Sequence, residues 1–404
     1  MLVYLLCVLG IGIPIMMAET LLGRRGRQSP INTMASLADE AGASALWRYV
    51  GWLGVVAGFL ILSYYSVIAG WSMAYLFKTA GGFLNHTTVE AAQQTFLDLK
   101  NAPDVQLVWH TLFIAGTLWI VSRGVSEGIE RVTRYMMPGL LIMLVALDIY
   151  ATGLDGFGQA FSFLFTPNLS RLTAESVLVG MGQAFFSLGL GMGSIMVYGS
   201  YLPDHVSISR STVVVALADT LVAVMAGLAM FPIAFSHHLE PGMGPGLIFE
   251  TLPLAFSQMQ WGGLIGTLFF ALVFIAAITS AIALIEPAVA WLTENQGMSR
   301  QKATTWAGAA CWLLGVGTLL SFNAWSDVTW FGKTFFELVD FITADFMLPL
   351  GGVLVAVFAG WVLSADISAQ ELALGRHFAL WRTLIRWVAP IAVTTIFLKA
   401  TGLL

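Results

Sequence analysis

GMGQAFFSLGLGMGSIMVYGSY, residues Gly180–Tyr201, is an apolar run long enough to cross a bilayer as a helix. Three glycines, Gly189, Gly191 and Gly193, alternate in its middle. A glycine inside a helix costs about 1 kcal/mol relative to alanine, so this pattern predicts a helix that opens midway. Opened backbone in hydrocarbon must line a polar cavity, as in transporter binding sites. The alternative is that the glycines only let a neighbouring helix pack closely.

The composition is that of a membrane protein. Of the 404 residues, 58% are hydrophobic and 10% are charged, far below the charge content of soluble domains. We therefore predict an all-α polytopic membrane protein that forms a single transmembrane domain over residues 1–404. Basic clusters of the kind that bind nucleic acid are absent from the sequence, so no nucleic-acid partner is expected. Cys7 and Cys311 both fall in apolar runs, which predicts buried free thiols.

Hydropathy divides the chain into ten candidate spans, each near the length of about 20 residues that a bilayer requires. Most of the 18 Lys and Arg side chains lie in one set of alternate loops, which the positive-inside rule places in the cytoplasm. We therefore expect a multi-pass protein of the cell (inner) membrane with both termini outside. The spans are Met1–Leu22, Leu46–Phe77, Val105–Val121, Arg134–Gly153, Ala174–Tyr201, Ser209–Phe235, Trp261–Leu292, Ala303–Phe322, Phe335–Leu363 and Trp381–Leu403.

Two connections on the predicted outer side are longer than simple turns. Gly81–Asp104 reads as a long polar loop. Ser236–Gln260 contains PGMGPGLIFETLPLAF, which predicts a folded lid with a short helix. Loops of this length in compact proteins tend to be functional.

Several polar residues fall at membrane depth. Asp219 lies well inside a span, which makes it a functional candidate, with an interhelical hydrogen bond as the alternative. Glu19 has either a structural role, holding opened backbone, or a role in transport. Thr279 and Ser280 have the hydroxyls to ligate a hard cation, although such hydroxyls usually bond back to their own helix.

Other polar residues carry weaker signals. In the Tyr64–Tyr65 pair one phenol is expected to face a neighbour or a ligand, and Glu286–Pro287 is read as a possible kink. Asp340 lies near the outer end of its span, where it is either a gate acid or an interfacial charge. The sequence contains no nucleotide motif, nucleophile–base pair or metal cluster, so we do not expect an enzyme.

Five segments carry a further signal: IPIMMAETLLGRRGRQSP, LSYYSVIAGW, GQAFFSLGLGMGSIMVYGSY, LADTLVAVMAGLAMFP and AITSAIALIEP, in this order. Together they resemble the neurotransmitter:sodium symporter family, and most of all its prokaryotic amino-acid transporters with eleven helices. The resemblance implies a leucine-transporter-like inverted-repeat helix bundle. The family's first helix, itself broken, should precede Met1, and nothing in this sequence corresponds to it, so the ten spans are expected to be family helices two to eleven and the domain to be N-terminally truncated relative to the family.

The resemblance also implies site residues. Tyr65 matches the tyrosine that meets the substrate carboxylate, and the other substrate-binding positions are Ile61, Phe186, Ser187, Gly189, Met192, Ala281 and Leu284. The sodium-binding positions are Ala276, Thr279 and Ser280 in one site and Ser187 and Asp219 in the other. A chloride-like site matches Tyr4, Gln183, Ser187 and Asp219, and the gates match Asp340 outside and Glu294 with Tyr201 inside. Glu19, Gly191 and Gly193 are expected to shape the broken helix.

The resemblance therefore implies sodium-coupled symport of an amino acid across the cell membrane by alternating access. We expect a neutral amino acid, because none of the matched pocket walls is charged. The alternative is a non-transporting truncated membrane protein, or a partner subunit that needs another chain to complete the site. The resemblance implies that sodium ions are required. Because the Asp219 carboxylate would supply a fixed negative charge at the chloride-like site, chloride is not expected to be required. The expected partners are the amino acid and the lipid bilayer, with a homodimer possible.

Overall fold

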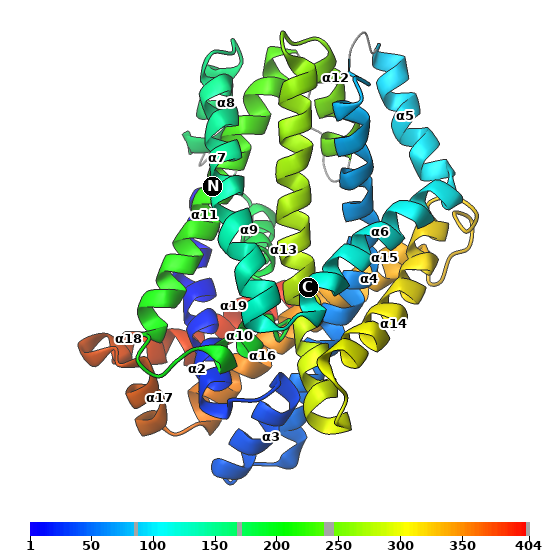
Figure 1. Ribbon diagram of the computed structural model, residues 1–404. Coiled ribbons are helices and arrows are strands. Elements are labelled where there is room, and N and C mark those ends of the chain that lie inside the picture. The colour runs from blue at the N-terminus through cyan, green and yellow to red at the C-terminus, as the bar shows by residue number, and fades with distance from the viewer. Residues whose placement is uncertain (85–87, 168–171, 238–245, 401–404) are drawn as a thin grey trace.

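The computed structural model describes residues 1–404 apart from 85–87, 168–171, 238–245 and 401–404 (Figure 1). Within this part the chain is helical, and its β pairing is limited to the isolated bridge between Trp330 and Lys333. Eight helices there are long and apolar enough to cross a membrane, as expected of a multi-pass membrane protein. They are α1–η1–α2 (Leu2–Gly26), η2–α4 (Ala45–Ala80), α6 (Pro103–Ser122), η3–α7 (Val125–Thr152), α11 (Ile208–Ser236), α13 (Gly262–Gln296), α14 (Arg300–Ser321) and α15–η6–α16–η7 (Phe335–Val362).

Some of these helices contain short π-helical segments, and η2 is a 3-10 turn. The bounds of the parts are α1 (Leu2–Cys7), η1 (Val8–Gly12), α2 (Ile13–Gly26), η2 (Ala45–Trp47), α4 (Arg48–Ala80), η3 (Val125–Glu130), α7 (Arg131–Thr152), α15 (Phe335–Asp340), η6 (Phe341–Met347), α16 (Leu348–Val357) and η7 (Phe358–Val362).

Of the two remaining predicted spans, the first is an interrupted helix and the second is a continuous helix with a π-helical segment. The run that begins at Ala174 is divided into α9 (Ala174–Ser187) and α10 (Ser194–Tyr201), with turns that contain left-handed glycines between them. The last span is built from α18 (Phe378–Thr383), η9 (Leu384–Val388) and α19 (Ala389–Ala400).

Short helices fill the connections. The predicted lid contains η5 (Leu247–Thr251) and α12 (Leu252–Ser257), which confirms a short helix there. The predicted polar loop Gly81–Asp104 is wrong as a plain loop, because the amphipathic helix α5 (Val89–Asn101) occupies half of it, capped by the Thr88 hydroxyl. The others are α3 (Pro30–Glu40), α8 (Phe157–Phe165), α17 (Ala365–Leu372) and η8 (Gly375–His377).

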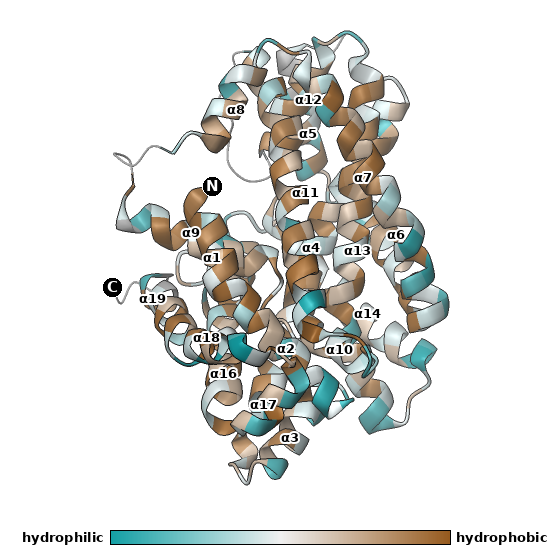
Figure 2. Cartoon of the chain, turned by 90° about the vertical axis from the view of Figure 1, so that its left-hand side faces the viewer, coloured by the Kyte–Doolittle hydropathy of each residue, from teal (hydrophilic) through white to brown (hydrophobic). Residues whose placement is uncertain are grey.

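Two ends of the bundle differ in polarity. Figure 2 shows hydrophilic residues gathered around α3 and α17, and we call this the arginine end, after Arg24, Arg25 and Arg27. The opposite end, with α5 and α12, is called the lid end. Between them α4 and α13 pack along one another in the centre, while α10 packs on α2. Cys7 and Cys311 are buried free thiols, as predicted.

Candidate substrate and ion site

The helix break between α9 and α10 lies at the three alternating glycines. Gly189, Gly191 and Gly193 have φ values of +66°, +78° and +72°, in the left-handed region that glycine adopts without strain. The sequence therefore opens the helix where propensity predicts, and the freed backbone groups need partners within the protein.

Glu19 on α2 supplies one of these partners. Its side chain is buried, and Oε1 accepts a hydrogen bond of 2.7 Å from the Gly191 amide. Its second oxygen, Oε2, is buried without a hydrogen-bond partner among the described residues. The sequence left open a structural role or a transport role for Glu19, and this hydrogen bond to the opened backbone is the structural role.

Close packing explains why glycine is needed both within the break and on the helix that faces it. A Cβ on Gly191 would lie 2.6 Å from the Leu348 carbonyl oxygen. On α4, a Cβ on Gly54 would lie 2.9 Å from the Gly193 nitrogen. The opened segment is thus held between α4 and α16.

The predicted pocket walls meet one turn further along α4. A Cβ on Gly58 of α4 would lie 3.2 Å from the carbonyl oxygen of Met192 in the helix break and 3.1 Å from that of Leu284 on α13. The helix break, α4 and α13 therefore meet at this point. Four of the predicted wall residues are buried in this region, and none is charged. They are Ile61, Met192, Ala281 and Leu284.

Tyr65 and the α13 hydroxyls form the polar part of this region. Tyr65 shares a hydrogen bond with Ser280. The Ala276 carbonyl oxygen accepts hydrogen bonds from Thr279 Oγ1 at 2.9 Å and from Ser280 Oγ at 3.1 Å. The hydroxyls therefore bond back to their own helix, and three oxygens of the kind that hard cations prefer are gathered together.

Ser187, at the end of α9, connects a second polar group. Tyr4 Oη lies 3.1 Å from Ser187 Oγ, and Ser187 also hydrogen-bonds the Asp219 carboxylate. Asp219 Oδ2 is buried and lacks a hydrogen-bond partner in the described part of the chain. A carboxylate oxygen without a donor is suited to a cation.

Gln183 and Phe186 lie on α9, within one turn before Ser187. Both line a cavity of about 160 Å³ between α9, η6, α16 and α19, where Asp345 and Pro349 form the facing wall. The Phe186 side chain is 44% exposed. The hydrogen bonds bring Tyr4, Ser187 and Asp219 together.

The predicted gate residues have partners within the chain. Asp340 accepts a hydrogen bond from Tyr64 near the lid end. At the arginine end, Glu294 accepts hydrogen bonds from the Ser29 amide and from Asn32. Tyr201 was grouped with Glu294 by resemblance, but its hydroxyl donates to Glu286 instead, at 2.7 Å.

Glu286 and Arg300 are the residues that the sequence reading missed. Glu286 is fully buried, and its two oxygens accept from Arg300 at 3.0 and 2.5 Å. Arg300 also donates from Nε to the Val121 carbonyl oxygen. The signal was present, because an ionisable residue inside an apolar span needs a partner. It was read as a possible kink, whereas α13 continues through Pro287.

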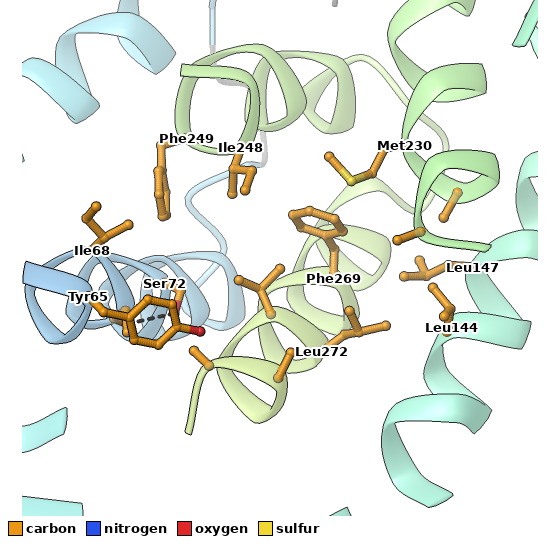
Figure 3. Close-up of a pocket in the computed structure, with 16 residues that line it drawn as sticks. Tyr65, Ile68, Ser72, Leu144, Leu147, Met230, Ile248, Phe249, Phe269 and Leu272 are labelled. Carbon is orange, nitrogen blue, oxygen red and sulfur yellow. Dashed lines mark hydrogen bonds between the residues drawn. The ribbon is translucent and has the colours of Figure 1, made fainter. Parts of the chain in front are cut away.

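An apolar cavity of about 280 Å³ borders the site on its lid side. Figure 3 shows its side chains converging from α4, α13, α7, α11 and the lid. Tyr65 and Ala276 belong to its lining, but the four buried wall residues do not. Its other polar lining residue, Ser72, already donates to the Ala69 carbonyl oxygen at 2.6 Å. This cavity can accept apolar groups, but it offers few contacts to a charged ligand.

Comparison with known proteins agrees with this geometry. The sequence pattern of the sodium:neurotransmitter symporter family matches residues 1–100 and 98–402. An uncharacterized sodium-dependent transporter of Bacillus subtilis, YhdH, is 36% identical over 100% of this chain and 90% of its own length. An uncharacterized sodium-dependent transporter of Haemophilus influenzae is 31% identical, over 98% of this chain and 89% of its own.

A solved structure is also similar. The crystal structure of MhsT in complex with L-phenylalanine matches with a TM-score of 0.91 and 40% sequence identity, over 99% of this chain and 90% of that one. The architecture is thus the leucine-transporter-like helix bundle that the resemblance implied. The family is one of secondary transporters, not enzymes. On its fold and its sequence, the chain belongs to the sodium:neurotransmitter symporter family.

Proposed function

We propose that this protein couples the movement of sodium to the uptake of a neutral amino acid by alternating access. The observation that carries the proposal is the opened backbone at Gly189–Gly193, held by Glu19 beside uncharged walls and two groups of oxygens. Discontinuous helices of this kind form midplane binding sites in transporters.

The two ends of an amino acid have suitable partners here. The Tyr65 hydroxyl and the N-terminus of α10 would bind the carboxylate, because hydroxyl donors and the positive end of a helix dipole favour negative charge. The side chain would enter the region of Ile61, Met192 and Leu284, which has no charge to neutralise. L-Phenylalanine, bound in the similar MhsT structure, is a ligand of this class.

Sodium would be bound by the two groups of oxygens. One group is Ala276, Thr279 and Ser280 on α13, and the other is Ser187 with Asp219. Because Asp219 carries its own negative charge beside Tyr4 and Ser187, we propose that chloride is not required. Asp340 with Tyr64, and Tyr201 with Glu286, would close the lid end and the arginine end in turn.

Uptake into proteoliposomes tests this proposal. The purified 404-residue chain would be given radiolabelled L-leucine or L-phenylalanine under an inward sodium gradient. We expect accumulation that disappears when potassium replaces sodium, and sodium-dependent binding by scintillation proximity. Glutamate and lysine serve as charged competitors that should not displace the label. If purified, folded chain binds none of the neutral amino acids in sodium, the proposal is wrong.

A further inference from the structure

The loop between α14 and α15 ends in a strained hairpin turn. Trp330 and Lys333 exchange both backbone hydrogen bonds, at 2.8 and 3.0 Å. At the tip, Phe331 and Gly332 have φ values of +54° and +76°. Two positive φ values define the type I′ turn, which favours Asn-Gly or Gly-Gly at low cost. A bulky aromatic residue at the first position is an outlier that calls for an explanation.

The strained residue presents its ring to the surroundings. Phe331 is 96% exposed, so packing within the chain does not account for it. Trp325, Val328 and Trp330 in the same loop are also exposed, by 38%, 42% and 41%. A phenylalanine left in water forgoes about 1.5–3 kcal/mol of burial free energy, so a partner for this apolar patch is favoured. We call residues Trp325–Lys333 the Phe331 hairpin.

The position of the hairpin identifies that partner. It follows α14, whose Trp306 and Leu313 side chains are each 67% exposed, as expected of a helix that faces lipid. Because α14 is a candidate span that ends at Ser321, we expect the loop to begin near the level where hydrocarbon gives way to headgroups. Figure 1 shows it projecting from the edge of the bundle, away from the helix break.

The chemistry of the hairpin fits the headgroup layer. Tryptophan concentrates at membrane interfaces, because its ring is apolar and its N–H is polar. Lys333, at the base of the hairpin, holds its Nζ 4.9 Å from the centre of the Phe341 ring on η6. We propose that the Phe331 hairpin is a lipid-interface anchor, which inserts Phe331, Trp325 and Trp330 among phospholipid headgroups.

Ring contacts connect this anchor to the candidate gate. Trp330 lies 6.4 Å from Phe335, at the start of α15, and the neighbouring Phe336 lies 5.6 Å from Tyr64. Tyr64 donates a hydrogen bond to Asp340. The depth of the hairpin in the headgroup layer would therefore set the position of the helix that carries Asp340.

Spin labelling in lipid nanodiscs tests the anchor. With Cys7 and Cys311 replaced by alanine, a nitroxide is attached at F331C or, as a matched exposed position outside the spans, at A91C on α5. Collision rates are then measured with oxygen, which partitions into lipid, and with a nickel chelate, which stays in water. In phosphatidylcholine nanodiscs we expect the oxygen-to-nickel ratio at 331 to exceed that at 91 by at least about threefold.

Two results would overturn the proposal. Equal ratios at 331 and 91 would mean that the tip lies in water. Spin–spin broadening at 331, in discs that contain two chains, would mean that a second copy covers the patch instead. Should F331C fail to fold, V328C in the same hairpin gives the same readout, and the same two outcomes apply. Neither result bears on the proposed transport, which is measured separately.

Discussion

Gly191 meets two constraints at once, one on its backbone and one on its surroundings. Its φ of +78° suits a residue without a Cβ, and the Leu348 carbonyl oxygen occupies the place where a Cβ would be. Its amide is also the group that Glu19 holds. Gly189 shares the first constraint only, because the nearest atom to its Cβ position, Met192 Sδ, is 4.0 Å away.

Gly191→Ala should therefore be much more harmful than Gly189→Ala. The left-handed φ costs a non-glycine residue about 1–2 kcal/mol, and crowding against Leu348 adds about 1–3 kcal/mol. We expect a lower melting temperature in detergent and loss of sodium-dependent binding for Gly191→Ala. Gly139→Ala is the control, since open space surrounds that helical glycine on α7 and alanine favours the helix. Native-like binding by Gly191→Ala would contradict the assignment of the site.

At the scale of elements, α13 carries the proposed sodium ligands in its middle and a buried ion pair nearer its end. Thr279 and Ser280 both donate to Ala276, one turn earlier. Thr293 makes the same kind of bonds, to Val289 and Ala290, two turns beyond Glu286. Thr279 and Thr293 therefore make the same hydrogen bonds within the helix. A difference in their effect on sodium binding would come from their different surroundings.

Thr279→Val should weaken sodium binding. The change keeps the shape of the side chain but removes one proposed oxygen ligand, so we expect the half-saturating sodium concentration to rise about tenfold, equivalent to about 1.4 kcal/mol. Scintillation proximity with a labelled amino acid measures this shift. Thr293→Val is the matched control on the same helix, and it should leave sodium dependence unchanged. An equal effect of both substitutions would point to helix stability rather than to ligation.

The Glu286–Arg300 pair belongs to the same element and predicts a stability effect. Arg300→Ala leaves the fully buried Glu286 carboxylate without its cation, which costs about 3–5 kcal/mol. Tyr201→Phe removes one hydrogen bond and should cost about 1.5–3 kcal/mol, because the acceptor is charged. Thermal unfolding in detergent should therefore rank Arg300→Ala below Tyr201→Phe. A double variant, Glu286→Leu with Arg300→Leu, is expected to recover much of the loss; a Tyr201→Phe protein less stable than Arg300→Ala would refute the ranking.

At the scale of the whole molecule, the proposed cycle requires charge balance in the bound state. Asp219 lies on α11, Ser187 on α9 and Tyr4 on α1, so three helices bring together one negative charge and two hydroxyls. A fixed carboxylate at this point would replace a bound anion.

Uptake should accordingly be unchanged when gluconate replaces chloride. In Asp219→Asn, which keeps the shape but removes the charge, we expect transport to fall and to depend on chloride. Asp148→Asn, at another half-buried aspartate in the span of α7, is the control and should stay independent of chloride. Collapse of native uptake in gluconate would exclude the proposed role of Asp219.

Local pattern was sufficient for much of the fold. The apolar runs predict the spans, and the alternating glycines predict the break, because both depend on residues close in sequence. The role of Glu286 was not predicted, because its partner Arg300 lies on the next helix and only packing brings the two together. The same applies to Tyr201, which resemblance grouped with Glu294 and which the fold places on Glu286.

The sequence alone thus determined the membrane class, the family likeness and the position of the opened helix, since hydropathy and backbone propensity are local properties. Tertiary structure decided which side chains meet at that opening. It joined Glu19 to Gly191 and Tyr4 to Ser187. Such contacts depend on how helices distant in the chain pack and turn about their axes, and single-sequence periodicity does not contain that information.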